Sequence, residues 1–82
     1  MQQRIIRHYG YDNQLGKLVE ELRELEQVIL YESSNIEHLK EEIADVLNLI
    51  EQIVDYQGWN DDVEEIKEYK IRRQIGRIEN DR

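Results

Sequence analysis

The segment NQLGKLVEELRELEQVILY, residues 13–31, decides which fold the rest of the chain can adopt. Its large apolar residues recur at alternating intervals of three and four positions, the pattern of a helix with one buried side. They are Leu15, Leu18, Leu22, Leu25 and Ile29. The pattern predicts an amphipathic helix over about residues 13–31, with Asp12 placed to cap its first turn. We expect the leucine stripe to be its buried side.

Three further segments carry helical signals. Residues 36–57 place apolar side chains at the same intervals and stop before a glycine, and Ser34 followed by Glu37 is the signature of a capping box at the start of this helix. Residues 60–78 begin with several acidic residues, which favour a helix N-terminus, and have a looser apolar side. Residues 4–9 are long enough for one or two additional helical turns.

The composition indicates one small, all-α domain over residues 1–82. The chain contains no proline and is rich in Glu, Leu, Ile, Lys and Arg, which are typical of helical proteins. It also contains no cysteine, which excludes a disulfide, a thiolate metal site and a thiol nucleophile. A chain of this size buries only about 60–65% of its unfolded surface, so its own core is marginal.

Short connections between long helices imply antiparallel neighbours. We therefore expect an antiparallel helical hairpin plus a third helix, completed as a four-helix-bundle-like core by oligomerisation. A homodimer or a homotetramer would meet that need. The heptad-like spacing also permits a plain coiled-coil hairpin.

The charge of the chain limits the classes of partner that it is expected to bind. The formal net charge is −8 and 37% of the residues are charged, which disfavours binding to a nucleic acid polymer or to an anionic membrane. No apolar run approaches the roughly 20 residues that span a membrane, and the N-terminal MQQRIIRHYG lacks the apolar core of a secretory signal. The expected location is the cytoplasm.

Two clusters of like charge interrupt the regular helical pattern. Glu20, Glu21 and Glu24 lie in the first long helix, and KEEIAD, residues 40–45, lies in the next. Carboxylates three or four positions apart on a helix repel each other by a few tenths of a kcal/mol. A solvated acidic face accounts for such clusters in an acidic chain, and so does a cation shared between them.

The apolar neighbours of the carboxylates favour a shared cation. The two pairs considered are Glu21 with Glu24 and Glu42 with Asp45. On a helical projection, Val28 falls in angle between the members of the first pair, and Leu49 between those of the second. Another helix is therefore expected to cover these flanks in part. Partly buried carboxylates are costly unless they are protonated or neutralised, and Mg²⁺ binds a few carboxylates together with water and phosphate.

The order of these residues resembles a known family. EELREL, residues 20–25, followed by EEIAD, residues 41–45, resembles the paired E-x-x-E and E-x-x-D motifs of the MazG-like, all-α nucleoside triphosphate pyrophosphohydrolases, in their small single-domain form. The similarity covers most of the chain, from NQLGKLVEEL to KIRRQIGRI. The residues that satisfy the two motifs are Glu21 and Glu24, then Glu42 and Asp45.

The resemblance implies a Mg²⁺-dependent enzyme that hydrolyses a (deoxy)nucleoside triphosphate to the monophosphate and pyrophosphate, in sanitation of the nucleotide pool. Mn²⁺ is a possible substitute for Mg²⁺. The implied metal ligands are Glu21, Glu24, Glu42 and Asp45. The implied catalytic residues are Glu20, Glu21 and Glu42, with Glu20 as an acceptor or base for the attacking water. Glu41 is an alternative for that role, although it is also explained as an ordinary exposed residue of an acidic helix. Metal ions suit this chemistry because they neutralise phosphate oxygens and activate water.

Four further residues are candidates for contacts with the substrate. Lys70 and Arg73 resemble the basic K-x-x-R element of the family and would bind phosphate, although basic residues are also favourable near any helix C-terminus. Gln14 could hydrogen-bond a base. Asn48, one turn after Asp45, could contact substrate or metal-bound water, or could be a polar residue at a helix interface.

Other readings stay open. A non-catalytic helical interaction module would bind no specific divalent cation, and the paired motifs argue against it. A nucleotide-binding regulator on the same scaffold would use the same ligands as the enzyme, so the sequence does not separate these two. His8 and His38 are assigned no role, and the absence of an E-x-x-H motif argues against a ferritin-like di-iron site.

Overall fold

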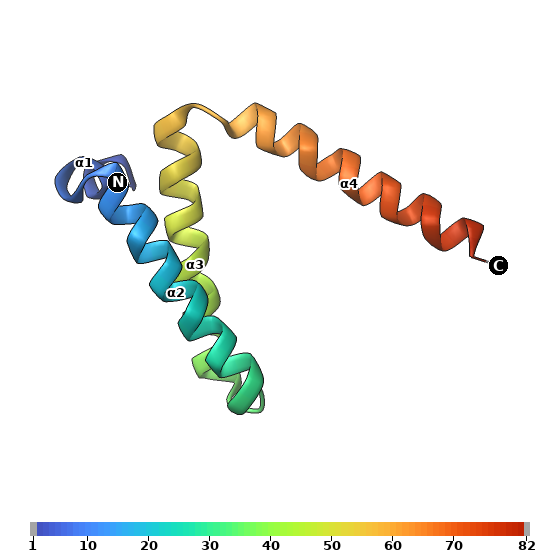
Figure 1. Cartoon of the computed structure of the whole chain (residues 1–82), viewed down its shortest axis with the longest axis horizontal. Helices are drawn as coiled ribbons and strands as arrows, with labels where there is room; N and C mark the ends of the chain where they lie inside the picture. Colours follow the sequence, from blue (N-terminus) through green and yellow to red (C-terminus); the bar gives the residue numbers. More distant parts are fainter. Residues whose placement is uncertain (1, 82) are drawn as a thin grey trace.

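The computed structural model describes residues 2–81, which form α-helices and contain no strand (Figure 1). The helices are α1 (Gln2–Tyr9), α2 (Tyr11–Tyr31), α3 (Ile36–Gln57) and α4 (Asn60–Asn80). The prediction of an all-α chain is confirmed. The two longest predicted segments, now α2 and α3, lie side by side as an antiparallel hairpin, and α4 is the predicted third helix (Figure 1).

The turn between α2 and α3 is fixed by a cap one residue later than expected. The side-chain Oδ1 of Asn35 accepts a hydrogen bond of 3.2 Å from the backbone N–H of His38. The predicted capping box of Ser34 and Glu37 is therefore wrong in register. Asn and Ser are both favourable N-caps, and the helix begins after the residue nearest its apolar run.

Two glycines with positive φ mark the ends of α1 and α3. Gly10 has φ 93°, which lets the chain turn from α1 into α2 with no further linker residue. Because α2 begins directly after it, Asp12 lies inside the first turn, and the prediction that Asp12 caps the helix is wrong. The sequence predicted that this helix ends near Gly58, and this is confirmed. Gly58 has φ 71° and adopts the left-handed conformation.

The line of contact along α2 differs from the predicted leucine stripe. The residues that α2 buries are Gln14, Glu21 and Val28, which recur every seven positions. Leu22 and Ile29, which belong to the predicted stripe, are 46% and 53% exposed. The stripe is therefore one flank of the interface with α3 and not its centre.

Helix α3 repeats this arrangement. Its buried apolar residues are Val46, Leu49 and Ile53, whereas Ile43 and Ile50 are 41% and 39% exposed. Both long helices thus meet along a narrow seam and leave an apolar flank uncovered. The predicted completion of the core by a second chain is not part of this single-chain structure.

Helices α1 and α4 are placed very differently. α1 packs against both α2 and α3, and its Ile6 is 1% exposed. α4 contacts only α3 among residues 2–81, diverges from the hairpin in Figure 1, and buries none of its residues. No helix in this described part of the chain has the length and apolar character needed to cross a membrane.

Replacement of Ile6 by Ala is expected to lower the free energy of unfolding by about 2–5 kcal/mol, because it leaves a cavity where α1 meets the hairpin. Ile5→Ala is the matched control, since Ile5 is 41% exposed, and should cost about 0.5 kcal/mol or less. Urea denaturation followed by circular dichroism measures both. Equal losses for the two variants would contradict the described packing of α1.

Candidate functional site

Three carboxylates converge in the seam between α2 and α3. Glu21, Glu24 and Glu42 each offer a carboxylate oxygen, and these oxygens lie within 4.8 Å of one another. Glu21 is 7% exposed and Glu42 8%, while Glu24 lies at the exposed edge. The expectation that another helix covers the two acidic flanks is therefore confirmed for one carboxylate of each pair.

The field around Glu21 disfavours its charge. Burial raises the pKa of its carboxyl, and the neighbouring Glu24 and Asp45 raise it further. Lys17 acts in the opposite direction, with its Nζ 3.5 Å from Glu21 Oε1 and 3.3 Å from Glu20 Oε2. The same contacts raise the pKa of Lys17. The exposed ammonium group of Lys17 is thus the cationic group that the described residues place against Glu21.

Two oxygens of this cluster have no donor. Glu21 Oε2 and Glu42 Oε2 are buried and accept no hydrogen bond from the described residues. A buried acceptor without a partner costs about 1–3 kcal/mol, and more when it is charged. A hard divalent cation prefers an all-oxygen set of carboxylates such as this one. The residues present therefore fit a cation such as Mg²⁺.

Two hollows open on this cluster, one at each side along the seam. The larger, of about 370 Å³, is lined by Glu24 and Glu42. The smaller, of about 230 Å³, is lined by several of the predicted site residues: Gln14, Glu21, Asp45 and Asn48. The structure thus brings both predicted amide side chains beside the predicted metal ligands.

A chain of amide hydrogen bonds, which the sequence did not predict, orients these amides. Gln2 Nε2 donates to Glu51 Oε2 over 3.1 Å and lies 3.4 Å from Asn48 Oδ1. Gln52 Nε2 donates to Gln2 Oε1 over 3.1 Å, and Gln14 Nε2 donates to Gln52 Oε1 over 2.7 Å. Because the carboxylate at one end only accepts, the direction of the whole chain follows. Gln14 therefore keeps its carbonyl oxygen, and Asn48 its amide N–H groups, for another partner.

The predicted basic residues lie elsewhere in this chain. Lys70 and Arg73 belong to α4, which makes no contact with α2 within residues 2–81. The Arg73 guanidinium instead lies 5.8 Å from the centre of the Tyr69 ring. The structure does not bring these two residues to the acidic cluster of the same chain.

One residue beside the cluster was missed. His38 Nε2 lies 3.4 Å from Glu42 Oε1, and its Nδ1 lies 3.3 Å from Glu32 Oε1. His38 was assigned no role from the sequence because it is not part of an E-x-x-H motif. The separation of four residues between His38 and Glu42, which places both on one side of a helix, is the signal that could have identified it.

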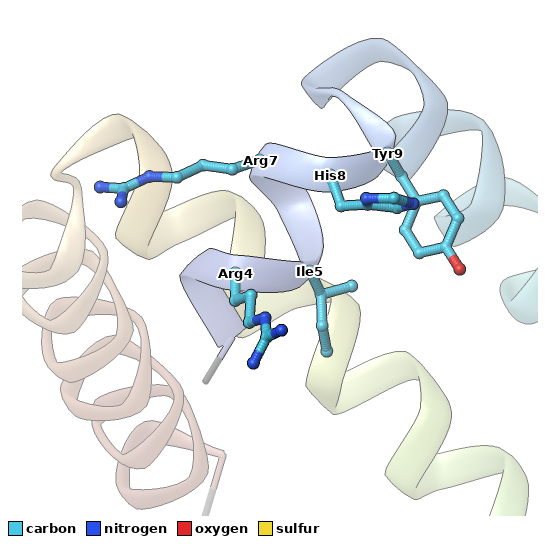
Figure 2. Close-up of a pocket in the computed structure, with 5 residues that line it drawn as sticks. All are labelled: Arg4, Ile5, Arg7, His8 and Tyr9. Atoms are coloured by element: carbon cyan, nitrogen blue, oxygen red, sulfur yellow. The ribbon is translucent and has the colours of Figure 1, made fainter.

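A third hollow, of about 500 Å³, lies on α1 and is distinct from this cluster. All five of its lining residues come from α1, with His8 and Tyr9 side by side and the two arginines extending away (Figure 2). It is lined by Arg4, Ile5, Arg7, His8 and Tyr9. It contains none of the predicted site residues, so the candidate site remains the seam between α2 and α3.

No protein-family model matches the chain, and no curated protein or solved structure matches it either. The resemblance to the MazG-like proteins therefore stays a hypothesis carried by the motifs. Any functional assignment depends on the residues of the seam.

The raised pKa of Glu21 predicts how stability depends on pH without metal. The folded chain keeps a proton on Glu21 at pH values where the unfolded chain, with its ordinary carboxyl pKa of 4.5, has released it. The folded state therefore binds more protons in that window, and the free energy of unfolding falls as pH rises from 4.5 through the raised pKa.

Urea denaturation in EDTA, at a series of pH values, measures this slope. Glu21→Gln should flatten it and stabilise the chain at neutral pH, because the substitution removes a buried charge. Glu20→Gln is the matched control, since its carboxylate is exposed, and should retain the slope. An unchanged slope in Glu21→Gln would show that the seam does not disfavour the charge.

Proposed function

We propose that the chain is a Mg²⁺-dependent nucleoside triphosphate pyrophosphohydrolase of the MazG-like type, which converts a (d)NTP to the (d)NMP and pyrophosphate. The observation that supports it most is the seam itself. Carboxylates from two helices converge there, in the order of the family's motifs, and two of their oxygens are buried without a donor. A merely solvated acidic face would leave those oxygens in water.

In this proposal the carboxylates of the two motifs hold the cation, namely Glu21, Glu24, Glu42 and Asp45. The bound ion would neutralise phosphate oxygens and lower the pKa of a coordinated water. Glu20 lies outside the seam beside Lys17, within reach of solvent, which suits an acceptor for the proton of the attacking water. The free carbonyl of Gln14 and the free amide of Asn48 offer one acceptor and one donor to the rest of the nucleotide.

We also propose that the active form is a homo-oligomer, at least a dimer. The polar flanks of α2 and α3 line the same hollows, so their apolar flanks share the opposite side of the hairpin. The exposed residues of that side include Leu15, Leu22, Ile29, Ile43 and Ile50. A second copy packed on this side would complete a four-helix bundle.

Assembly would also give α4 a partner. A 21-residue helix without buried side chains gains little from tertiary packing, and isolated helices are only marginally stable. The basic half of α4, with Lys70 and Arg73, is complementary in charge to the acidic hairpin. We therefore assign these two residues to the phosphates of a site on another copy. We propose the cytoplasm as the location of this activity.

Release of pyrophosphate from a panel of (d)NTPs, with Mg²⁺ and with EDTA, tests the reaction. We expect pyrophosphate, and not orthophosphate, only when the metal is present. Glu42→Gln should lower turnover at least about 100-fold, since changes even to groups around a metal ligand cost about 10–100-fold. Glu37→Gln, on the exposed side of α3 and outside the predicted site, is the matched control and should stay within a few-fold of wild type.

Mg²⁺-dependent nucleotide binding without any product would favour the regulatory reading over the enzyme. If the protein neither binds nor hydrolyses any nucleotide of the panel, the proposed function is contradicted altogether. Circular dichroism of Glu42→Gln checks that lost turnover does not come from lost folding, and removal of one buried like charge should leave its helices intact.

The proposed assembly predicts that Leu22→Gln combined with Ile43→Gln shifts the chain to monomers at micromolar concentration. The reason is that both residues lie on the uncovered apolar side of the hairpin. Sedimentation velocity measures the shift. Arg23→Gln, adjacent to Leu22 but exposed and charged, is the control and should leave the oligomer unchanged. A monomeric wild type at the same concentration would contradict the assembly.

A further inference from the structure

His38 lies at the wall of the larger hollow, between the end of α2 and the second turn of α3. Its ring faces two carboxylates, with Nδ1 3.3 Å from Glu32 Oε1 and Nε2 3.4 Å from Glu42 Oε1. Its side chain is 35% exposed, whereas the Glu42 side chain is 11% exposed. The ring therefore lies between a solvent-accessible carboxylate and one buried in the seam, and it donates to both when both of its nitrogens carry a proton.

The backbone on both sides of the ring is anchored. The N–H of His38 donates to Asn35 Oδ1 over 3.2 Å, which fixes the first turn of α3. The N–H of Glu32 donates to the carbonyl of Val28 over 2.8 Å, which fixes the last turn of α2. Because these two turns are joined by a short connection, the backbone positions of Glu32 and His38 are fixed relative to each other.

This arrangement treats the two oxygens of Glu42 differently. Oε1 faces the ring nitrogen of His38, whereas Oε2 is buried and has no partner among the described residues. A contact at one oxygen limits the rotation of the carboxylate, and so also limits the directions in which its other oxygen can point. Carboxylates that bind metal are commonly oriented in this way by a neighbouring hydrogen bond.

We propose that His38, held in place by Glu32, is a positioning residue that orients the Glu42 carboxylate for a divalent cation in the seam. This inference rests on the metal site of the proposed function. It adds a requirement that the two acidic motifs do not contain: the Mg²⁺ affinity depends on a hydrogen-bonding side chain at position 38.

The test is calorimetric titration of the metal-free protein with Mg²⁺ alone, which needs no turnover. His38→Leu should weaken Mg²⁺ binding about tenfold, within the range of changes to groups that orient metal ligands. His38→Gln should recover most of the affinity, because its amide N–H can reach Glu42 as the ring does. His8→Leu is the matched control, since His8 is exposed on α1, and should bind as wild type.

Several results would overturn the proposal. Unchanged or tighter Mg²⁺ binding in His38→Leu would mean that the ring does not orient the ligand. Equal loss in His38→Leu and His38→Gln would indicate a role in packing alone. A wild type that binds no Mg²⁺ would remove the metal site itself, and with it the proposed function. If wild type and His38→Leu instead bind Mg²⁺ equally well, only the role of His38 is overturned, and the metal site of the proposed function stands.

If His38→Leu does not fold by circular dichroism, Glu32→Gln provides the measurement. This change keeps the ring in place but weakens its anchor, since a neutral amide replaces the carboxylate. Mg²⁺ binding should weaken a few-fold in Glu32→Gln. Unchanged affinity in this variant would overturn the proposal as well.

Discussion

The burial of the Glu21 and Glu42 carboxylates between α2 and α3 is the constraint to which the rest of the structure responds. Each is less than one-tenth exposed, and each has one oxygen without a donor in the described part of the chain. Buried like charges oppose association of the two helices that carry them. Val28 and Leu49, which lie in the same seam, supply apolar contact that holds the helices together against this repulsion.

This constraint connects the site to the rest of the molecule. The hairpin uses its seam for polar groups, including the hydrogen-bonded pair of Gln14 and Gln52, and places much of its apolar surface on the opposite flank. A cation in the seam and a second copy on the apolar flank would each stabilise the same hairpin. The hairpin thus has its candidate binding groups at its centre, and an oligomer would derive much of its stability from the outer apolar surface.

Much of the fold could be predicted from the sequence because its determinants are local. The apolar periodicity fixed the long helices to within a few residues, and Gly58 gave the end of α3. The caps were wrong by one or two positions, because Asn35 competes with Ser34 at the start of α3 and because α2 begins directly after Gly10, before Asp12. The leucine stripe was misassigned because periodicity identifies an apolar side but not the partner that covers it.

The candidate site, like the fold, could be predicted from the sequence only in part. The convergence of three of the four motif carboxylates followed from angles on each helix, with Val28 and Leu49 as the decisive neighbours, whereas Asp45 lies outside the group of Glu21, Glu24 and Glu42 and lines the smaller hollow. The amide chain from Gln2 to Gln14 was not predictable, because it joins residues up to 50 positions apart through α1. The position of α4 also could not be predicted from the sequence. Its apolar residues are irregularly spaced, and such a helix does not specify which chain it packs against.

The most direct measurement of the central claim is an anomalous difference map from crystals of the wild-type protein grown with Mn²⁺, which scatters anomalously and substitutes for Mg²⁺. If the seam binds a divalent cation, a Mn²⁺ peak is expected there, within coordination distance of carboxylate oxygens from Glu21, Glu24 and Glu42. A well-ordered seam with no anomalous peak, or peaks only on the exposed acidic residues, would contradict the account. The buried carboxylates would then be a structural feature without a metal.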